Sequence, residues 1–236
     1  MSETIRSLCM SLILWFTDTG LTPSRKSWTI RNLAERGYFP IHSFVMVDPD
    51  DIRRHLPEFD LYVAKSPQQA GDLTRKEAGY IAETLTEIAL QRGRNVLVDG
   101  TLKDHRWYSH FFAMLREQRP NIKIAILHIT APRHAIMERA KQRAHMTGRV
   151  VPRDTIELAM REVPKSVEIL APRTDFYAEI YNAPEAPHVE MRTEHISWED
   201  FTNVWTQTCS SSTKKEIDDC IGSTSECEAP TLRSVL

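Results

Sequence analysis

The sequence LCMSLILWFTDTGLTPSRKS (Leu8–Ser27) joins an apolar run to a loop and then to a helix-forming segment. A phosphate-binding P-loop has the form G-x-x-x-x-G-K-[ST] between a buried strand and a helix. Here Gly20 is followed by four residues and then by Arg25, Lys26 and Ser27, so an arginine replaces the second glycine. Lys26 and Ser27 are placed to reach phosphates and Mg²⁺, whereas the side chain of Arg25 can crowd the loop. Alone, the motif leaves a phosphate site and a plain strand-to-helix turn equally open.

Length, charge and cysteine content restrict the class of protein. A chain of 236 residues can form one domain with a tail. The formal net charge of -2 argues against a broad surface for nucleic acid or anionic membrane. No apolar run approaches the roughly 20 residues of a membrane helix. The four cysteines match no zinc or redox spacing, so we expect free thiols in the cytoplasm.

Apolar runs alternate with helix-forming segments along the chain. The runs 8–16, 43–47, 95–98 and 122–129 are typical of buried strands, with weaker strand patterns at 176–181 and 188–192. Helical patterns cover 26–36, 74–92, 107–118 and 133–145, and Gly37 and Gly93 are expected to end the first two. This alternation predicts an α/β fold, a parallel sheet with helices on both faces. Ligands bind at the carboxyl ends of such strands, so the residues after each strand are the candidates for chemistry.

The helix predicted from Thr74 to Arg92 has a start signal and an apolar face. Thr74 and Glu77 form the T-x-x-E pattern of a capping box. The residues expected to face the core are Ala78, Ile81, Leu85 and Ile88. Glu83 lies on the other side, where a solvated position is the plainer interpretation.

Carboxylates gather after the second predicted strand, in VDPDDIRRH. Asp48, Asp50 and Asp51 fall within four residues, and their charges repel unless a cation or substrate hydroxyls lie between them. The pattern therefore favours Mg²⁺ coordination or a general base. The alternative is a solvated turn in which Asp50 or Asp51 caps a short helix.

Four arginines follow the fourth predicted strand, at positions 139, 143, 149 and 153, around the loop TGRVVPR. Arginines on such a segment can close over transferring phosphoryl charge as a lid does. A solvated helical face explains them equally well.

Taken in order, these segments resemble the zeta-toxin family of P-loop kinases. The resemblance extends from Leu8 to Pro172 and is carried by VDPDDIRRHLPEF, LTRKEAGYIAETLTEIALQRGRNVLVDGT, ILHITAPRHAIMERAKQRA and TGRVVP. It implies a P-loop NTPase/kinase-like sheet and a reaction in which ATP and Mg²⁺ phosphorylate a hydroxyl of a small molecule. Bacterial toxin members of the family act on UDP-N-acetylglucosamine.

The resemblance also implies a role for each candidate residue. The nucleotide loop corresponds to Gly20, Arg25, Lys26 and Ser27, and the metal-binding positions to Ser27 and Asp48. The catalytic positions are those of the general base and of two lid arginines, Asp50, Arg143 and Arg149. The acceptor-binding positions are Glu83, Asp99 and Thr101, with an aspartate at 99 where the family has the glutamate of an E-G-T turn.

The expected organisation is a kinase domain at 1–172, an α/β extension of it at 173–208 and a disordered tail at 209–236. The family's phosphate loop is rich in glycine, whereas GLTPSRKS carries Thr, Pro and Arg in place of three small residues. A catalytically impaired nucleotide-binding or scaffold protein is therefore an alternative to an active small-molecule kinase. A related kinase that acts on another small molecule or on a nucleic-acid end is a further alternative.

Overall fold

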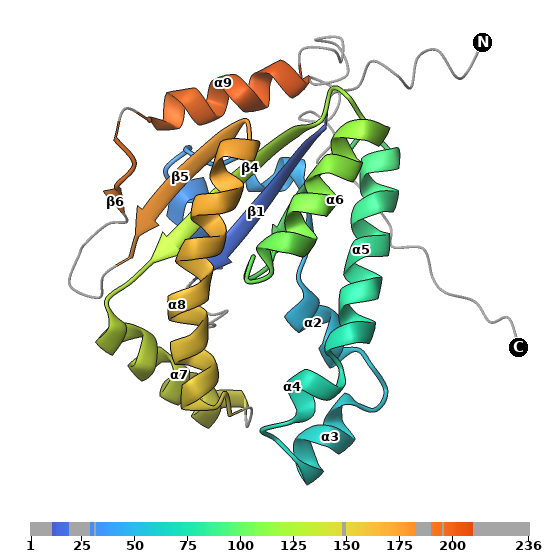
Figure 1. Ribbon diagram of the computed structural model, residues 1–236, viewed down its shortest axis with the longest axis vertical. Helices are drawn as coiled ribbons and strands as arrows, with labels where there is room; N and C mark the ends of the chain where they lie inside the picture. The colour runs from blue at the N-terminus through green and yellow to red at the C-terminus, as the bar shows by residue number, and fades with distance from the viewer. Residues whose placement is uncertain are drawn as a thin grey trace, which may run out of the picture.

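The computed structural model describes residues 11–18, 29–30, 32–147, 150–182, 190–194 and 196–209 (Figure 1). In this part of the chain one six-stranded sheet has the order β2-β3-β1-β4-β5-β6. Its strands are β1 (Leu12–Asp18), β2 (Phe44–Val47), β3 (Asn95–Asp99), β4 (Lys123–Thr130), β5 (Phe176–Tyr181) and β6 (Glu190–Met191). The first five pair in parallel, and β6 is antiparallel to β5. The predicted α/β fold with a parallel sheet is confirmed.

Helices cover both faces of the sheet, because its central strands are apolar on both sides. Alternate side chains of β1, β3 and β4 pack against α5 (Arg75–Gln91), α6 (His105–Gln118) and α8 (Arg153–Leu170). The other set of side chains packs against the helical residues 29–30 and 32–35 and against α9 (Trp198–Cys209). Because β2 lies at the sheet edge, its Val45 and Met46 are exposed, so the expectation that all of this strand is buried is wrong.

Three short helices follow β2 and lead into α5. They are α2 (Pro49–Arg54), α3 (Phe59–Lys65) and α4 (Ala70–Leu73), and Figure 1 shows them grouped beside the start of α5. α7 (Arg133–Thr147) follows β4 and precedes α8. None of the helices in the described ranges is long and apolar enough to cross a membrane.

The prediction that two glycines end helices is confirmed. Gly37 and Gly93 have φ angles of 75° and 68°, in the left-handed region that glycine adopts without strain. After Gly37 the backbone N–H of Tyr38 donates to the carbonyl of Leu33 at 2.9 Å. After Gly93 the N–H of Arg94 donates to the carbonyl of Ala89 at 3.0 Å. Both helices therefore close with the hydrogen bond typical of a glycine C-cap.

The predicted buried face of α5 is partly wrong. Leu85 and Ile88 are 43% and 40% exposed. The residues that are buried are mostly small, Ala78, Ala82, Thr86, Ala89 and Leu90. Small side chains let the helix axis approach the sheet closely, so the larger residues beside them are left at the rim of the contact.

The capping box predicted at the start of α5 does not form. The hydroxyl of Thr74 donates to the carbonyl of Ala70 at 2.8 Å, one turn earlier. Since α4 ends directly at Thr74, this carbonyl is within reach and the hydroxyl turns back toward it. Glu77 instead lies beside Glu58, whose contact raises the pKa of Glu77.

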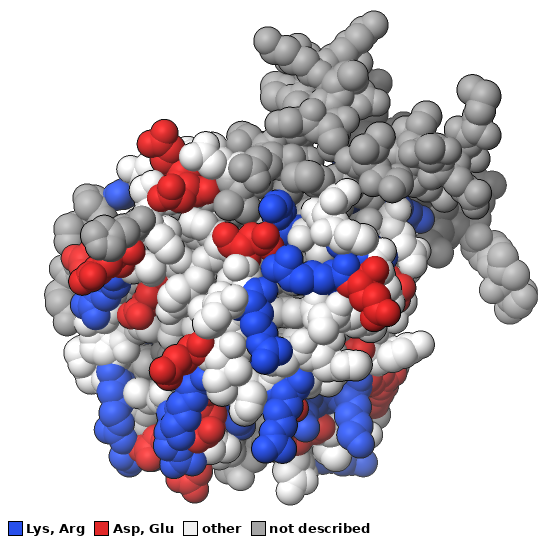
Figure 2. Space-filling view, turned by 45° about the horizontal axis from the view of Figure 1, so that its top comes forward, with Lys and Arg blue, Asp and Glu red and all other residues white. Residues whose placement is uncertain are grey.

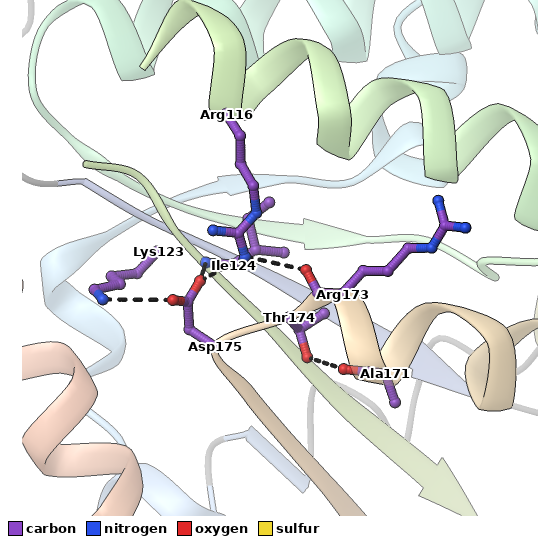
Figure 3. A network of polar contacts seen from close by, with 7 residues as sticks. All are labelled: Arg116, Lys123, Ile124, Ala171, Arg173, Thr174 and Asp175. Carbon is purple, nitrogen blue, oxygen red and sulfur yellow. Dashed lines mark hydrogen bonds and ion pairs between the residues drawn. The ribbon is translucent and has the colours of Figure 1, made fainter. Parts of the chain in front are cut away.

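Asp175 joins the start of β5 to the start of β4 (Figure 3). Its carboxylate accepts from the backbone N–H of Ile124 at 2.9 Å and from the Arg116 guanidinium at 2.9 Å. The ammonium of Lys123 lies 3.4 Å from its other oxygen. The Arg116 guanidinium also donates to the carbonyl of Arg173. This network fixes the end of the sheet opposite the carboxyl ends of the strands.

We expect Asp175→Ala to lower the free energy of unfolding by about 1–2 kcal/mol, because the N–H of Ile124 and the Arg116 guanidinium lose their acceptor. The loss is small because these groups are partly exposed to solvent. Urea denaturation measures it. Arg173→Ala is the matched control, since Arg173 contributes its carbonyl rather than its side chain. Equal stability of the two variants would contradict the prediction.

Candidate active site

A cleft of about 350 Å³ opens at the carboxyl ends of β2 and β3. One wall comes from the start of α2, with Asp48, Asp50 and Arg53. The residues after β3 form a second wall, and α4 and the starts of α5 and α8 supply the rest. Four predicted site residues therefore share one cleft, Asp48, Asp50, Asp99 and Thr101.

Asp48 and Asp50 are positioned by the first turn of α2. The Asp48 carboxylate accepts from the backbone N–H of Asp50 at 2.8 Å, so Asp48 is the N-cap of this helix. The alternative in which Asp50 or Asp51 supplies the cap is therefore wrong. Pro49 at the first helical position supports the same start, because proline lacks the N–H that would need a partner there.

Asp48 lies in an environment crowded with negative charge. Burial raises the pKa of its carboxyl group, and the charges of Asp99 and Asp50 raise it further. Hydrogen bonds from the backbone N–H groups of α2 act in the opposite direction. Asp99 lies close because β2 and β3 are in register, with Val47 paired to Val98. A cation at this point would relieve the repulsion among the three carboxylates.

Gly100 sits where the cleft wall meets α6. A Cβ atom at this position would lie 3.2 Å from the hydroxyl oxygen of Tyr108, closer than ordinary contact. Glycine therefore allows the turn after β3 and the Tyr108 hydroxyl to lie against each other. Burial raises the pKa of Tyr108, and the charges of Glu83 and Asp104 raise it further.

Glu83 is set apart from the other predicted acceptor-binding residues. It lies on the exposed side of α5 and is not among the described residues that line the cleft. Partial desolvation raises the pKa of its carboxyl group. Its influence on Tyr108, which does line the cleft, indicates that Glu83 is close to one side of it.

Several cleft residues were missed from the sequence, notably Arg53, Asp72, Arg75, Lys103 and Tyr108. Arg53 had a usable signal, because it lies three residues after Asp50 in a helix. The others come from segments whose position against the cleft depends on tertiary packing. The cleft thus contains both cations and carboxylates. Figure 2 shows that positive and negative side chains are also interspersed on the face of the molecule that it draws.

The predicted nucleotide loop and part of the predicted lid lie outside the described residues. This applies to Gly20, Arg25, Lys26, Ser27 and Arg149, and to the predicted tail after Cys209. Arg143 belongs to α7, and its side chain is also outside the described part.

The other two arginines of this predicted segment have partners among the described residues. Arg139 is buried, and its guanidinium donates to the carbonyl of Asn182 at 2.9 Å. The Asn182 amide in turn donates to the hydroxyl of Thr29 at 2.7 Å. Arg153 pairs with Glu157 on the exposed side of α8. Arg139 therefore links α7 to the end of β5 and, through Asn182, to Thr29.

Among the described residues, no group of three or more His, Cys, Asp or Glu side chains is arranged to hold a metal ion. Mg²⁺ sites in phosphoryl-transfer proteins often use only one or two protein ligands, with water and phosphate oxygens completing the shell. The crowded carboxylate of Asp48 suits such a partial site.

Comparison with known proteins identifies a family that the chain matches. The family model described as Zeta toxin matches residues 20–189. No curated protein matches the chain.

Two solved structures have a similar fold. One comes from the PezAT chromosomal toxin–antitoxin system of Streptococcus pneumoniae, with a TM-score of 0.56, 13% identity and coverage of 86% of each chain. The other is a candidate kinase from Chloroflexus aurantiacus, with a TM-score of 0.52, 12% identity and coverage of 85% of this chain and 98% of that one. At such low identity these likenesses concern the fold. Because the family model itself spans most of the sequence, the chain belongs to the zeta toxin family.

Proposed function

We propose that the protein is an ATP-dependent kinase that transfers the γ-phosphoryl group of ATP to a hydroxyl of a small molecule in the cytoplasm. The observation that carries the proposal is the cleft that Asp50 and the turn Asp99–Thr101 line together at the carboxyl ends of β2 and β3. The family assignment and the similarity to a candidate kinase support it. A UDP-sugar is the acceptor class that we propose, by analogy with the bacterial toxins of the family.

In the proposed reaction Asp50 accepts the proton of the acceptor hydroxyl. The hydroxyl oxygen forms a bond to the γ-phosphorus while the bond from that phosphorus to the bridging β,γ-oxygen breaks. Asp99 and Thr101 hold the acceptor through its polar groups, with Glu83 at the side of the cleft. Lys26, Arg143 and Arg149 neutralise the negative charge on the phosphates.

Ser27 and Asp48 are the residues that would hold Mg²⁺. The ion would supply charge neutralisation on the phosphate oxygens. The carboxylate of Asp48 suits this role because burial, together with the charges of Asp99 and Asp50, raises its pKa, and a cation would offset this effect. Gly20 and Arg25 would belong to the same loop as Lys26 and contact the phosphates.

A nucleotide-binding protein with impaired catalysis is the second candidate. The observation that favours it is Arg25, which stands where the phosphate loop normally has glycine. A side chain there competes with phosphate for space. The carboxylate of Asp50 in the cleft supports the active kinase instead, since nucleotide binding alone needs no general base.

A thermal-shift titration tests the proposed nucleotide loop. At Mg-ATP concentrations about 100 times Kd, binding adds roughly 2.7 kcal/mol to stability, which raises Tm by roughly 5–10 °C for a protein of this size. Lys26→Ala is expected to abolish most of this rise. Lys65→Ala is the control, because Lys65 is an exposed lysine at the end of α3.

The outcomes separate the candidates. A wild-type protein that shows no Tm rise with Mg-ATP contradicts the kinase and the nucleotide-binding protein alike. A rise that persists in Lys26→Ala shows that the loop has been misassigned. A rise without transfer of labelled γ-phosphate to UDP-sugars or other hydroxyl compounds favours the impaired protein.

A further inference from the structure

Arg53 is an unusual cleft residue because it is a charged side chain that is only 6% exposed. Its Nη1 lies 2.8 Å from Oδ1 of Asp50, one helical turn earlier on α2. The same helix contains a second pair with the same spacing, Arg54 and Asp51, at 3.5 Å. That pair is 51% and 61% exposed, so it provides an internal comparison.

The burial of Arg53 follows from the packing of α2. This six-residue helix lies against α5 and α3, which exclude water from one of its sides. Burying a guanidinium costs several kcal/mol unless hydrogen-bonding partners replace the lost water. Asp50 provides such a partner for Nη1 of Arg53. Because the packing of α2 buries Arg53, the contact with Asp50 is favoured over contact with water.

The contact also restricts the carboxylate of Asp50. An aspartate in a short helix can rotate about two side-chain bonds, and only some rotamers direct its oxygens into the cleft. The N-terminal turn is already fixed by the cap from Asp48 to the Asp50 N–H. With Oδ1 held by Arg53, the rotation of the Asp50 side chain is restricted as well. Backbone and side chain of Asp50 are therefore both positioned before any ligand binds.

We propose that Arg53 is a positioning residue for phosphoryl transfer, which holds the Asp50 carboxylate in the orientation that accepts the proton of the acceptor hydroxyl. This inference rests on the proposed function of Asp50. Misplacement of a reacting group by about 1 Å costs roughly 100-fold in rate. The rate of the chemical step, rather than substrate affinity, is therefore what Arg53 controls.

The test compares the steady-state kinetics of Arg53→Met, Arg53→Lys and Arg54→Met with those of wild type. The concentrations of ATP and of a UDP-sugar acceptor are varied in turn. Arg53→Met keeps the length of the side chain and removes its charge, so kcat is expected to fall about 10- to 100-fold while both KM values stay within about twofold. Arg53→Lys keeps the charge without the planar fork and is expected to give an intermediate kcat. Arg54→Met, the matched exposed control, is expected to behave as wild type.

Three results overturn the inference. One is an increase in KM with unchanged kcat in Arg53→Met, which makes Arg53 a substrate-binding residue. Another is an equal fall in kcat for Arg53→Met and Arg54→Met. The third is a kcat of Arg53→Lys equal to that of wild type. If circular dichroism shows that Arg53→Met does not fold, the kcat of Arg53→Lys alone tests the inference.

The outcome for Asp50 separates this inference from the proposed function. If Asp50→Asn is inactive while Arg53→Met has the kcat of wild type, the positioning role is wrong and the proposed base remains. If Asp50→Asn retains the kcat of wild type, the proposed function of Asp50 fails, and the positioning role fails with it.

Discussion

Asp50→Asn is expected to lower kcat for phosphoryl transfer by about 10³-fold, because a general base contributes roughly 10²–10⁴-fold and an amide cannot take the proton. Mg-ATP binding is expected to stay close to that of wild type, since the proposed nucleotide loop is a different segment. Asparagine retains an oxygen that can accept from Arg53, so the structure of α2 should be preserved. Measurements of kcat and of the Tm rise with Mg-ATP check the two halves of the prediction.

The choice of asparagine follows from the structure. Asp50→Ala would remove the oxygen that accepts from a buried guanidinium, and breaking a buried charge pair is strongly destabilising. A loss of activity in the alanine variant would therefore mix chemistry with unfolding. Comparing the stabilities of the asparagine and alanine variants separates the two effects.

Asp51→Asn is the matched control for this substitution. Asp51 is the next residue of α2, but its carboxylate is 61% exposed and lies 3.5 Å from the exposed Arg54. Its loss should leave kcat unchanged. If Asp50→Asn instead abolishes the Tm rise with Mg-ATP, Asp50 belongs to the nucleotide site and the general base must be sought elsewhere in the cleft.

The sheet could be predicted from the sequence because its central strands are continuous apolar runs. β1, β3 and β4 are covered on both faces, so each contains an unbroken run of apolar residues, with polar residues mainly toward the strand ends. The position of the cleft then followed from the rule that ligands bind at the carboxyl ends of parallel strands. Asp48 and Asp99 were found in this way, since each directly follows or ends a strand.

Helix orientation was harder to predict because it depends on what each face meets. The larger apolar residues of α5 suggested one buried face, but close contact with the sheet selects the alanines beside them. The hydrophobicity of the residues alone does not show how closely a helix approaches a sheet. Thr74 is a similar case. Its hydroxyl donates to the nearby carbonyl of Ala70 instead of capping α5, and the capping pattern does not include that carbonyl.

The remaining cleft residues depend on contacts between segments distant in sequence. Tyr108 enters the site because Gly100 lets its hydroxyl approach the turn after β3. Arg75 and Lys103 reach the cleft from the start of α5 and from the loop before α6. No local pattern marks such residues, because the partner that gives each of them a role lies in another element.

His128 gives the second large expected effect, a loss of stability in acid. It lies on β4 between Thr17 of β1 and Glu179 of β5, and is 3% exposed. Its Nε2 has no hydrogen-bond partner among the described residues. Burial lowers the pKa of His128 to about 4, although the nearby charge of Glu179 acts in the opposite direction.

The sign of the effect follows from proton linkage. Between the ordinary histidine pKa of about 6.5 and a pKa of about 4, the unfolded chain binds a proton that the folded protein does not. Stability therefore falls as the pH drops through this window. The expected loss is about 2 kcal/mol between pH 7 and pH 5, and about 3 kcal/mol once the pH is below both values.

Urea denaturation of wild type and of His128→Leu from pH 7 to pH 4 isolates this contribution, because the other titrating groups are common to both proteins. Leucine cannot take a proton, so the difference in unfolding free energy between the two proteins should change by about 2 kcal/mol between pH 7 and pH 5, in favour of the variant. His110→Gln, an exposed histidine on α6, is the control and should follow wild type. Parallel curves for wild type and His128→Leu would mean that water or a neighbouring side chain stabilises the protonated ring, and that His128 is not held neutral by burial.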